Sequence, residues 1–152
     1  MEHLVYCDKK AKVLDKILSG TKTMIIRGAA GRKFPHSRVF AGETLYFITN
    51  DGSGIIKARA EVKNAFSSEK MTEEESKAVV ADNMYKLNLT DDQLNRWSGK
   101  KYLVLVEIEN VSVIEPPLQL DHQKNMDDWL IVEKIEDILV GTSKKFEYVK
   151  IK

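Results

Sequence analysis

A group of basic side chains early in the chain could bind an anionic ligand. Its members flank a strand-like segment and continue into the loop that follows: Lys22, Arg27, Arg32, Lys33, His36 and Arg38. Small residues at 28–31 would let a ligand approach the backbone closely, and Phe34 or Phe40 could stack on an unpaired base. Because lysine and arginine neutralise phosphate groups, this pattern predicts a site for a nucleic acid or a nucleotide. The alternative is an ordinary surface loop whose phenylalanines anchor it to the core.

The charge distribution favours the same part of the chain. Overall, 24 Lys and Arg residues nearly balance 23 Asp and Glu residues, which leaves a net charge of +1. Residues 1–60 nevertheless carry a net charge of +6, and residues 61–152 a net charge of −5. A domain that collects basic residues in one stretch can present a positive patch to a polyanion. Lysines that are simply solvated would give the same count.

Composition excludes several classes of protein. The 152 residues, 43% of them hydrophobic, are enough to build one core, and we expect a single domain over residues 1–152. The sequence has no apolar run of about 18 residues that could span a bilayer, and its N-terminus lacks the features of a signal peptide. We therefore expect a soluble, cytoplasmic protein without a membrane partner. The lone Cys7 and three scattered histidines show no metal-ligand spacing, so neither a metal nor a cofactor is predicted.

The N-terminal segment is expected to position the basic group. Residues 3–7 have the pattern of a short, buried strand, and Asp8 is placed to cap a helix over Lys9–Ser19. Lys22–Arg27 has the apolar, β-branched centre of a central strand that is buried on both faces. Because the basic residues at its two ends are five positions apart, a regular strand would direct them to opposite faces.

A β-hairpin is predicted after the loop of residues 28–42. Thr44–Thr49 and Ile55–Phe66 are strand-like, and a glycine-rich turn at residues 50–54 joins them. The second strand alternates apolar and charged residues over 56–63, which is typical of a strand with one buried and one solvated face.

The rest of the chain is predicted to alternate between helix and strand. The expected elements are two helices, a long strand, a helical stretch and a closing strand, over residues 73–84, 91–97, 101–115, 127–139 and 145–151. Capping boxes at Thr72 and Thr90 would start the helices, and Pro116-Pro117 would end the long strand. This order of elements predicts an α+β fold with a curved mixed or antiparallel, barrel-like sheet and flanking helices.

Four segments resemble the sequence pattern of ASCH domains, which belong to the PUA-like superfamily. In Ile17–Arg27, a helix ends in glycine and leads to a strand framed by lysine and arginine. Three later segments fit the pattern in order and spacing: Gly42–Phe47, Tyr102–Glu107 and Val111–Pro116. The resemblance covers about residues 5–118 and leaves 119–152 as a C-terminal extension. It implies a PUA-like, barrel-like sheet and a cleft that receives RNA or a nucleotide.

The resemblance also implies an enzymatic alternative. Some ASCH-like proteins are amidohydrolases that deacylate acetylated cytidine with a lysine, a threonine three residues on and a downstream glutamate. Lys22 matches the lysine, whereas Ile25 stands in the place of the threonine and has no hydroxyl. Asp82 or Glu107 is the candidate acid.

Three functions are thus open at the level of the sequence. The leading hypothesis is an RNA-binding domain in which the basic group neutralises phosphates. The second is a small amidohydrolase for a modified nucleoside, in which Lys22, desolvated in a cleft, acts as base or nucleophile. The third is a protein-interaction domain that uses the acidic C-terminal half. The oligomeric state is not predicted.

Overall fold

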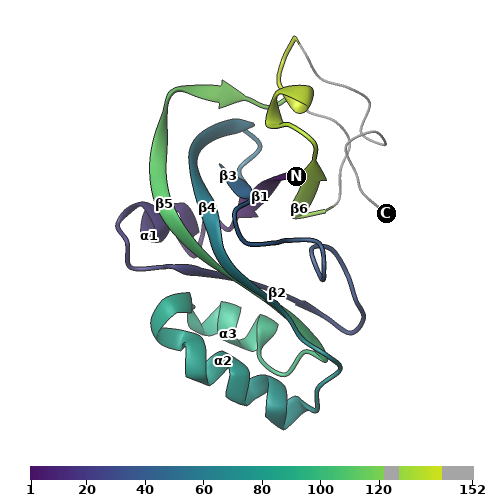
Figure 1. The fold of residues 1–152 in the computed structure, drawn as a ribbon. Helices are drawn as coiled ribbons and strands as arrows, with labels where there is room; N and C mark the ends of the chain where they lie inside the picture. Colours follow the sequence, from purple (N-terminus) through teal and green to yellow (C-terminus); the bar gives the residue numbers. More distant parts are fainter. Residues whose placement is uncertain (122–126, 142–152) are drawn as a thin grey trace.

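A curled sheet with helices packed against it forms the framework of the protein. The computed structural model describes residues 1–121 and 127–141 (Figure 1). Within these ranges a six-stranded sheet in the order β2-β5-β4-β3-β1-β6 curls into a half-barrel. Its strands are β1 (Glu2–Cys7), β2 (Met24–Ala29), β3 (Thr44–Thr49), β4 (Ile55–Ser67), β5 (Tyr102–Gln119) and β6 (Trp129–Val132). The helices are α1 (Val13–Leu18), α2 (Glu73–Leu87), α3 (Asp91–Trp97) and the 3-10 helix η1 (Ile135–Ile138).

The predicted α+β fold with a curved, PUA-like sheet is confirmed. The sheet is mixed, because β1 runs parallel to β3 while the other neighbouring strands are antiparallel. β3 and β4 form the predicted hairpin, and the alternating apolar side chains of β4 from Ile56 to Val62 are buried. The capping boxes of Thr72 and Thr90 are both present at the starts of α2 and α3. No helix in the described ranges is long and apolar enough to cross a membrane.

The prediction that Pro116-Pro117 ends the long strand is wrong, since β5 continues to Gln119. The reason lies in the register with β4. Ile56 pairs with Leu118 and Ala58 with Val113, so residues 114–117 lie opposite a single residue of β4. Proline is tolerated in such a bulge because the residue there does not need to donate a hydrogen bond to the ladder.

The helical stretch predicted around Asp127–Leu139 is also wrong. All four side chains of β6 are buried, and the strand pairs antiparallel with the first residues of β1. A short apolar run that is buried on both faces fits a strand better than an amphipathic helix. Only η1, a single turn, is helical in this region. The closing strand predicted over Lys145–Ile151 lies outside the described residues.

Two further details differ near the N-terminus. α1 begins at Val13 rather than Lys9, because Lys12 adopts a left-handed conformation with φ of 54°. Asp8 caps a turn before the helix, where its Oδ1 accepts a hydrogen bond from the Ala11 amide at 3.1 Å. β2, which was predicted to be a central strand, is an edge strand of the sheet. It is nevertheless buried on both faces over Met24–Ile26, as predicted.

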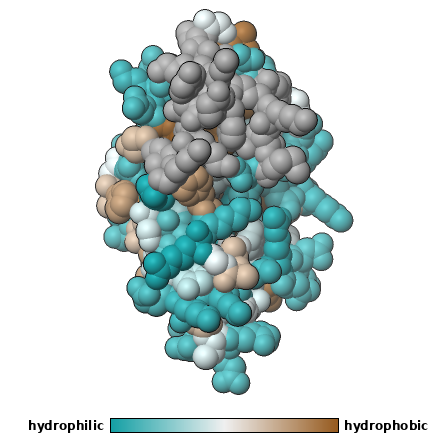
Figure 2. Space-filling view, turned by 90° about the vertical axis from the view of Figure 1, so that its right-hand side faces the viewer, coloured by the Kyte–Doolittle hydropathy of each residue, from teal (hydrophilic) through white to brown (hydrophobic). Residues whose placement is uncertain are grey.

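Three apolar clusters hold the half-barrel together. The largest fills the inside of the curled sheet and includes Val5, Ile25 and Val104, with α1 packed against it. A second packs the outer face of β2 and β5 against α2 and α3, which lie together below the sheet in Figure 1. The third joins β1, β3 and β6 to η1. The face seen in Figure 2 is largely hydrophilic outside the residues drawn in grey.

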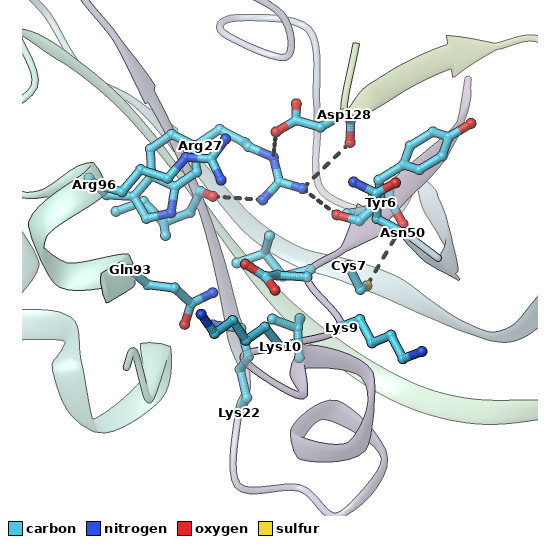
Figure 3. A pocket seen from close by; sticks show the side chains of 16 residues that line it. Tyr6, Cys7, Lys9, Lys10, Lys22, Arg27, Asn50, Gln93, Arg96 and Asp128 are labelled. Carbon is cyan, nitrogen blue, oxygen red and sulfur yellow. Dashed lines mark hydrogen bonds and ion pairs between the residues drawn. The ribbon is translucent and has the colours of Figure 1, made fainter. Parts of the chain in front are cut away.

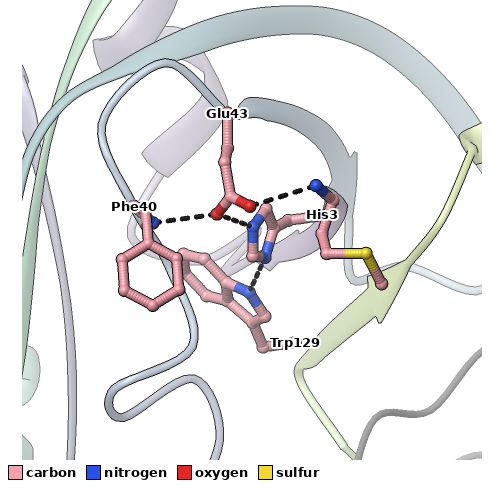
Figure 4. A network of polar contacts seen from close by, with 5 residues as sticks. His3, Phe40, Glu43 and Trp129 are labelled. Carbon is pink, nitrogen blue, oxygen red and sulfur yellow. Dashed lines mark hydrogen bonds and ion pairs between the residues drawn. The ribbon is translucent and has the colours of Figure 1, made fainter.

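A buried polar network fixes the start of β1 (Figure 4). His3 is fully buried, and its Nδ1 accepts a hydrogen bond from Trp129 Nε1 at 3.0 Å. Nδ1 therefore carries no hydrogen, so Nε2 is the protonated nitrogen and donates to Glu43 Oε1 at 2.9 Å. Glu43 also accepts the Phe40 amide and the N-terminal ammonium. A second proton on His3 would break the bond from Trp129.

This network predicts a loss of stability in mild acid. Burial lowers the pKa of folded His3 below its ordinary value of 6.5, although its hydrogen bond to Glu43 opposes the shift. The stabilisation by neutral His3 is thus complete above pH 6.5 and is lost as pH falls toward the lower folded pKa. This group adds at most about 1.4 kcal/mol per pH unit to the free energy of unfolding. Urea unfolding at several pH values between 5 and 8 measures this effect. As pH falls, the free energy of unfolding should decrease less steeply for His3→Gln than for the wild type. The same pH dependence in both proteins would contradict this account.

Candidate nucleic-acid interface

The candidate site lies at the open seam of the half-barrel. β6 pairs with β1 only over Glu2–Val5, so the last residues of β1, Tyr6 and Cys7, extend beyond it. Opposite them is the edge strand β2. A pocket of about 330 Å³ occupies the seam and is lined by residues of β1, β2, the loop after β1, and α3 (Figure 3). We call it the first pocket.

Arg27 ties the two sides of the seam together. Its Nε lies 3.1 Å from Asp128 Oδ2 in an ion pair, and its side chain is only 14% exposed. One terminal nitrogen donates to the Tyr6 carbonyl at 2.8 Å and the other to the Ile26 carbonyl at 2.9 Å (Figure 3). The guanidinium also lies 5.5 Å from the ring centre of buried Trp129. Most of its donors are therefore occupied by the protein itself.

A second pocket of about 170 Å³ adjoins the first. It is lined by the end of β2, the loop that follows, and the start of β5. Four residues line both pockets and form what we call the divider: Arg27, Arg96, Trp97 and Asp128. The two pockets thus lie on either side of the divider, and we refer to them together as the groove.

Lys22 lies at the wall of the first pocket and is 3% exposed. Its ammonium donates to the carbonyl of Leu87, the last residue of α2, and Lys16 donates to the next carbonyl, Asn88, at 3.0 Å. The carbonyls at the end of a helix lack intrahelical partners and attract cations. Burial lowers the pKa of Lys22 to about 7, and the nearby charges of Lys16 and Arg27 add to the effect. Because Lys22 precedes β2, both it and Arg27 line the pocket despite their strand parity.

Burial has the opposite effect on the neighbouring thiol. Cys7 also lines the first pocket but is 1% exposed, as expected of a buried small hydrophobe. Desolvation raises its pKa to about 12, against the influence of Arg27 and Lys22. A thiol with this pKa is protonated at neutral pH and is a poor nucleophile.

The structure distributes the other predicted basic residues unevenly. Lys33 and His36 line the second pocket, whereas Arg32 and Arg38 line neither pocket. His36 is buried, and its Nε2 lies 2.7 Å from the Ser68 carbonyl, so it anchors the loop. Arg32 is exposed and pairs with Glu69 at 3.3 Å. Arg38 lies over the ring of Phe34.

The two candidate acids lie away from the groove. Asp82 is exposed on α2, and Glu107 on β5 forms an ion pair with Lys86 at 3.0 Å. Neither lines the first or the second pocket. The carboxylates that do line the first pocket belong to Asp8 and Asp128, which the sequence did not single out as acids. In the described part of the chain, no group of three or more His, Cys, Asp or Glu could hold a metal ion.

Several residues of the groove were not predicted. Lys10 and Arg96 line the first pocket, Lys100 lines the second, and all are exposed. Among the described residues, the side chains of these three and of Lys33 make no hydrogen bond or ion pair. Arg96 contacts only the ring of Trp97, with its Cζ 4.5 Å from the ring centre. The capping box that starts α3 is the only sequence signal for its position, and it says nothing about which residues face the seam.

Comparison with solved structures identifies the architecture. The chain is similar to the crystal structure of ASCH from Zymomonas mobilis, with a TM-score of 0.62 and 12% sequence identity over 84% of this chain and 85% of that chain. Two mutants of that protein match with TM-scores of 0.63 and 0.60, at 12% and 14% identity. The alignments cover 84% and 79% of this chain and 85% and 76% of theirs.

This chain has an ASCH-like fold. The resemblance inferred from short sequence segments is therefore confirmed at the level of the fold. No protein-family model matches the sequence, and no curated protein matches it. At such low identity the ASCH-like fold is shared, while the residues of the groove have to be interpreted from this chain alone.

The role of Arg27 as a tie predicts a specific loss of stability. Arg27→Lys keeps the positive charge but loses the planar fork that bonds Tyr6, Ile26 and Asp128 at once. We expect the free energy of unfolding to fall by about 2–4 kcal/mol. The matched variant Arg96→Lys, at an exposed residue with only a ring contact, should cost less than about 0.5 kcal/mol. Urea unfolding monitored by circular dichroism measures the free energy of unfolding of both variants. Equal losses in the two variants would contradict the role of Arg27 as a tie across the seam.

Proposed function

We propose that this protein binds single-stranded nucleic acid, with RNA as the expected ligand, in the groove along its seam. One observation carries the proposal: Lys10, Lys33, Arg96 and Lys100 all line the two adjoining pockets, and none has an ion-pair partner among the described residues. A cation that is already paired gains little from a phosphate, whereas an unpaired one can exchange its counterion for it. These four residues, rather than Lys22 and Arg27, are the proposed phosphate contacts.

The aromatic residues of the groove support a ligand with bases. Trp97 belongs to the divider, and Phe34 and Tyr102 line the second pocket. Arg96 is exposed, and its Cζ lies 4.5 Å from the centre of the Trp97 ring, so its guanidinium is accessible to a base. Bases stack on aromatic rings and on arginine planes when they are unpaired. A duplex hides its bases, so a groove of this kind favours a single strand.

The fold is compatible with this proposal, which itself rests on the unpaired cations. The resemblance to ASCH domains implies a cleft that receives RNA or a nucleotide, and the groove lies at the seam of the ASCH-like half-barrel. We assign no protein-binding role to the acidic C-terminal half.

A second candidate function rests on Lys22. Lys22 lines the first pocket and has a pKa of about 7, so near neutral pH a large fraction of its amine is uncharged and could act as a base or nucleophile. In the amidohydrolase alternative, water would add to the acyl carbon of an acylated cytidine, and cleavage of the C–N bond would release the carboxylic acid and cytidine. Because Asp82 and Glu107 lie elsewhere, the acid would have to be Asp8 or Asp128.

The binding proposal predicts a steep dependence on salt. With four phosphate contacts to a single strand, the slope of log affinity against log salt should be about −3. Fluorescence anisotropy with a labelled single-stranded RNA measures this slope for the protein. Lys100→Gln should reduce its magnitude by about 0.7, because one contact is lost. Lys57→Gln, on the exposed face of β4, is the matched control and should leave it unchanged. A flat salt response, or tighter binding to duplex RNA than to the single strand, would refute the proposal.

The enzymatic alternative predicts release of free acid from acetylated cytidine. Incubation with the protein, followed by an assay for acetate, tests it directly. If Lys22 is the base, activity should rise with pH through about 7, where the amine loses its proton, and Lys22→Met should abolish it. Circular dichroism of Lys22→Met is needed as a control for folding. Absence of acetate from the folded wild-type protein would remove this candidate.

A further inference from the structure

We infer that the groove holds two consecutive nucleotides, one in each pocket, with the phosphate that links them at Arg96. This inference rests on the proposed function and specifies its ligand: a dinucleotide step of a single strand rather than an isolated nucleotide. It follows from the arrangement of the divider between two pockets of different character.

Three members of the divider are held in place by the protein, and the fourth is an exposed cation. Arg27 and Asp128 are held by their ion pair and by the bond from Arg27 to Tyr6, and Trp97 is 7% exposed. The pairing with Arg27 compensates the Asp128 charge, which would otherwise repel a phosphate. Arg96 is the exposed member, and its ring contact with Trp97 holds the guanidinium between the pockets. A phosphate bound there would have one pocket on each side.

The first pocket has the groups needed to hold a base by its edge. The side-chain amides of Asn50 and Gln93 both line it (Figure 3). The Gln93 oxygen is used in the α3 capping box, which leaves its NH₂ group as a donor. The Asn50 side chain makes no hydrogen bond among the described residues. Amides offer both donors and acceptors, so this pocket can distinguish bases by hydrogen bonding.

The second pocket has a different set of groups. It is smaller, and it combines the aromatic rings of Phe34 and Tyr102 with the ammonium groups of Lys33 and Lys100. Rings stack on any base, and ammonium groups bind phosphate without regard to sequence. We therefore place the base-selective contacts in the first pocket and the stacked, unselective nucleotide in the second.

Isothermal titration of the full chain with a ladder of uridylates tests the inference. The ligands are 5′-UMP and the 5′-phosphorylated di-, tri- and tetranucleotides, all at one salt concentration. We expect affinity to rise about tenfold from one nucleotide to two, since both pockets are then occupied, and to change less with each further addition. Arg96→Gln should abolish this tenfold rise in affinity. Arg59→Gln, a matched change on the exposed face of β4, should retain it.

Other outcomes separate this inference from the proposed function. Equal affinity for 5′-UMP and the dinucleotide would overturn the inference but leave a nucleotide site. Equal increments at every length, reduced alike in Arg96→Gln and Arg59→Gln, would indicate unspecific attraction by charge and overturn it as well. No binding of any ligand would refute both. Backbone NMR gives an independent readout, because the dinucleotide should shift the amides of both Asn50 and Tyr102, and a shift of only one would contradict the inference.

Discussion

The ion pair and hydrogen bonds of Arg27 hold the open side of the half-barrel. Among the described strands, sheet hydrogen bonds join all neighbours in the sheet, whereas β1 and β2 line the same pocket without forming a ladder. A planar guanidinium can bond several acceptors at once, and here it bridges the Tyr6 carbonyl, the Ile26 carbonyl and Asp128. The seam is thus fixed at one point and remains open on either side of it. Both pockets exist because a side chain, and not a strand, spans this gap.

The cations of the groove fall into two groups. Some are bonded within the protein and stabilise the fold, and others are unpaired and available to a ligand. Lys22 and Arg27 were predicted from their positions around a strand, and both do line the first pocket. Yet their donors go to the end of α2 and across the seam. The unpaired cations come instead from the loops and from the end of α3, a segment in the acidic part of the sequence. The excess of positive charge in residues 1–60 therefore identified only some of the cations of the groove. Arg96 and Lys100 lie outside that part of the sequence, and folding places them beside residues more than 60 positions earlier.

Local patterns predicted local structure well, and the failures involve contacts between distant segments. Capping boxes at Thr72 and Thr90 and the alternation of β4 depend on neighbours within a few residues, and all three were confirmed. The continuation of β5 past Pro116 depends on its register with β4. β6 depends on pairing with β1, more than 120 residues earlier. The edge position of β2 likewise follows from strand order. The groove combines residues from five separate parts of the chain, so its lining could not be obtained from spacing alone.

The burial of Lys22 links the energetics of the fold to those of the site. An ammonium without water is costly unless it is bonded, and here the carbonyl at the end of α2 provides the bond. That cost also lowers the pKa to about 7, so near neutral pH the residue carries only part of a charge. A partly charged, already bonded amine adds little to counterion release when a strand binds. Its uncharged form is, by contrast, the one that amine chemistry requires. The feature that makes Lys22 a weak phosphate contact is therefore the same feature that keeps the enzymatic alternative testable.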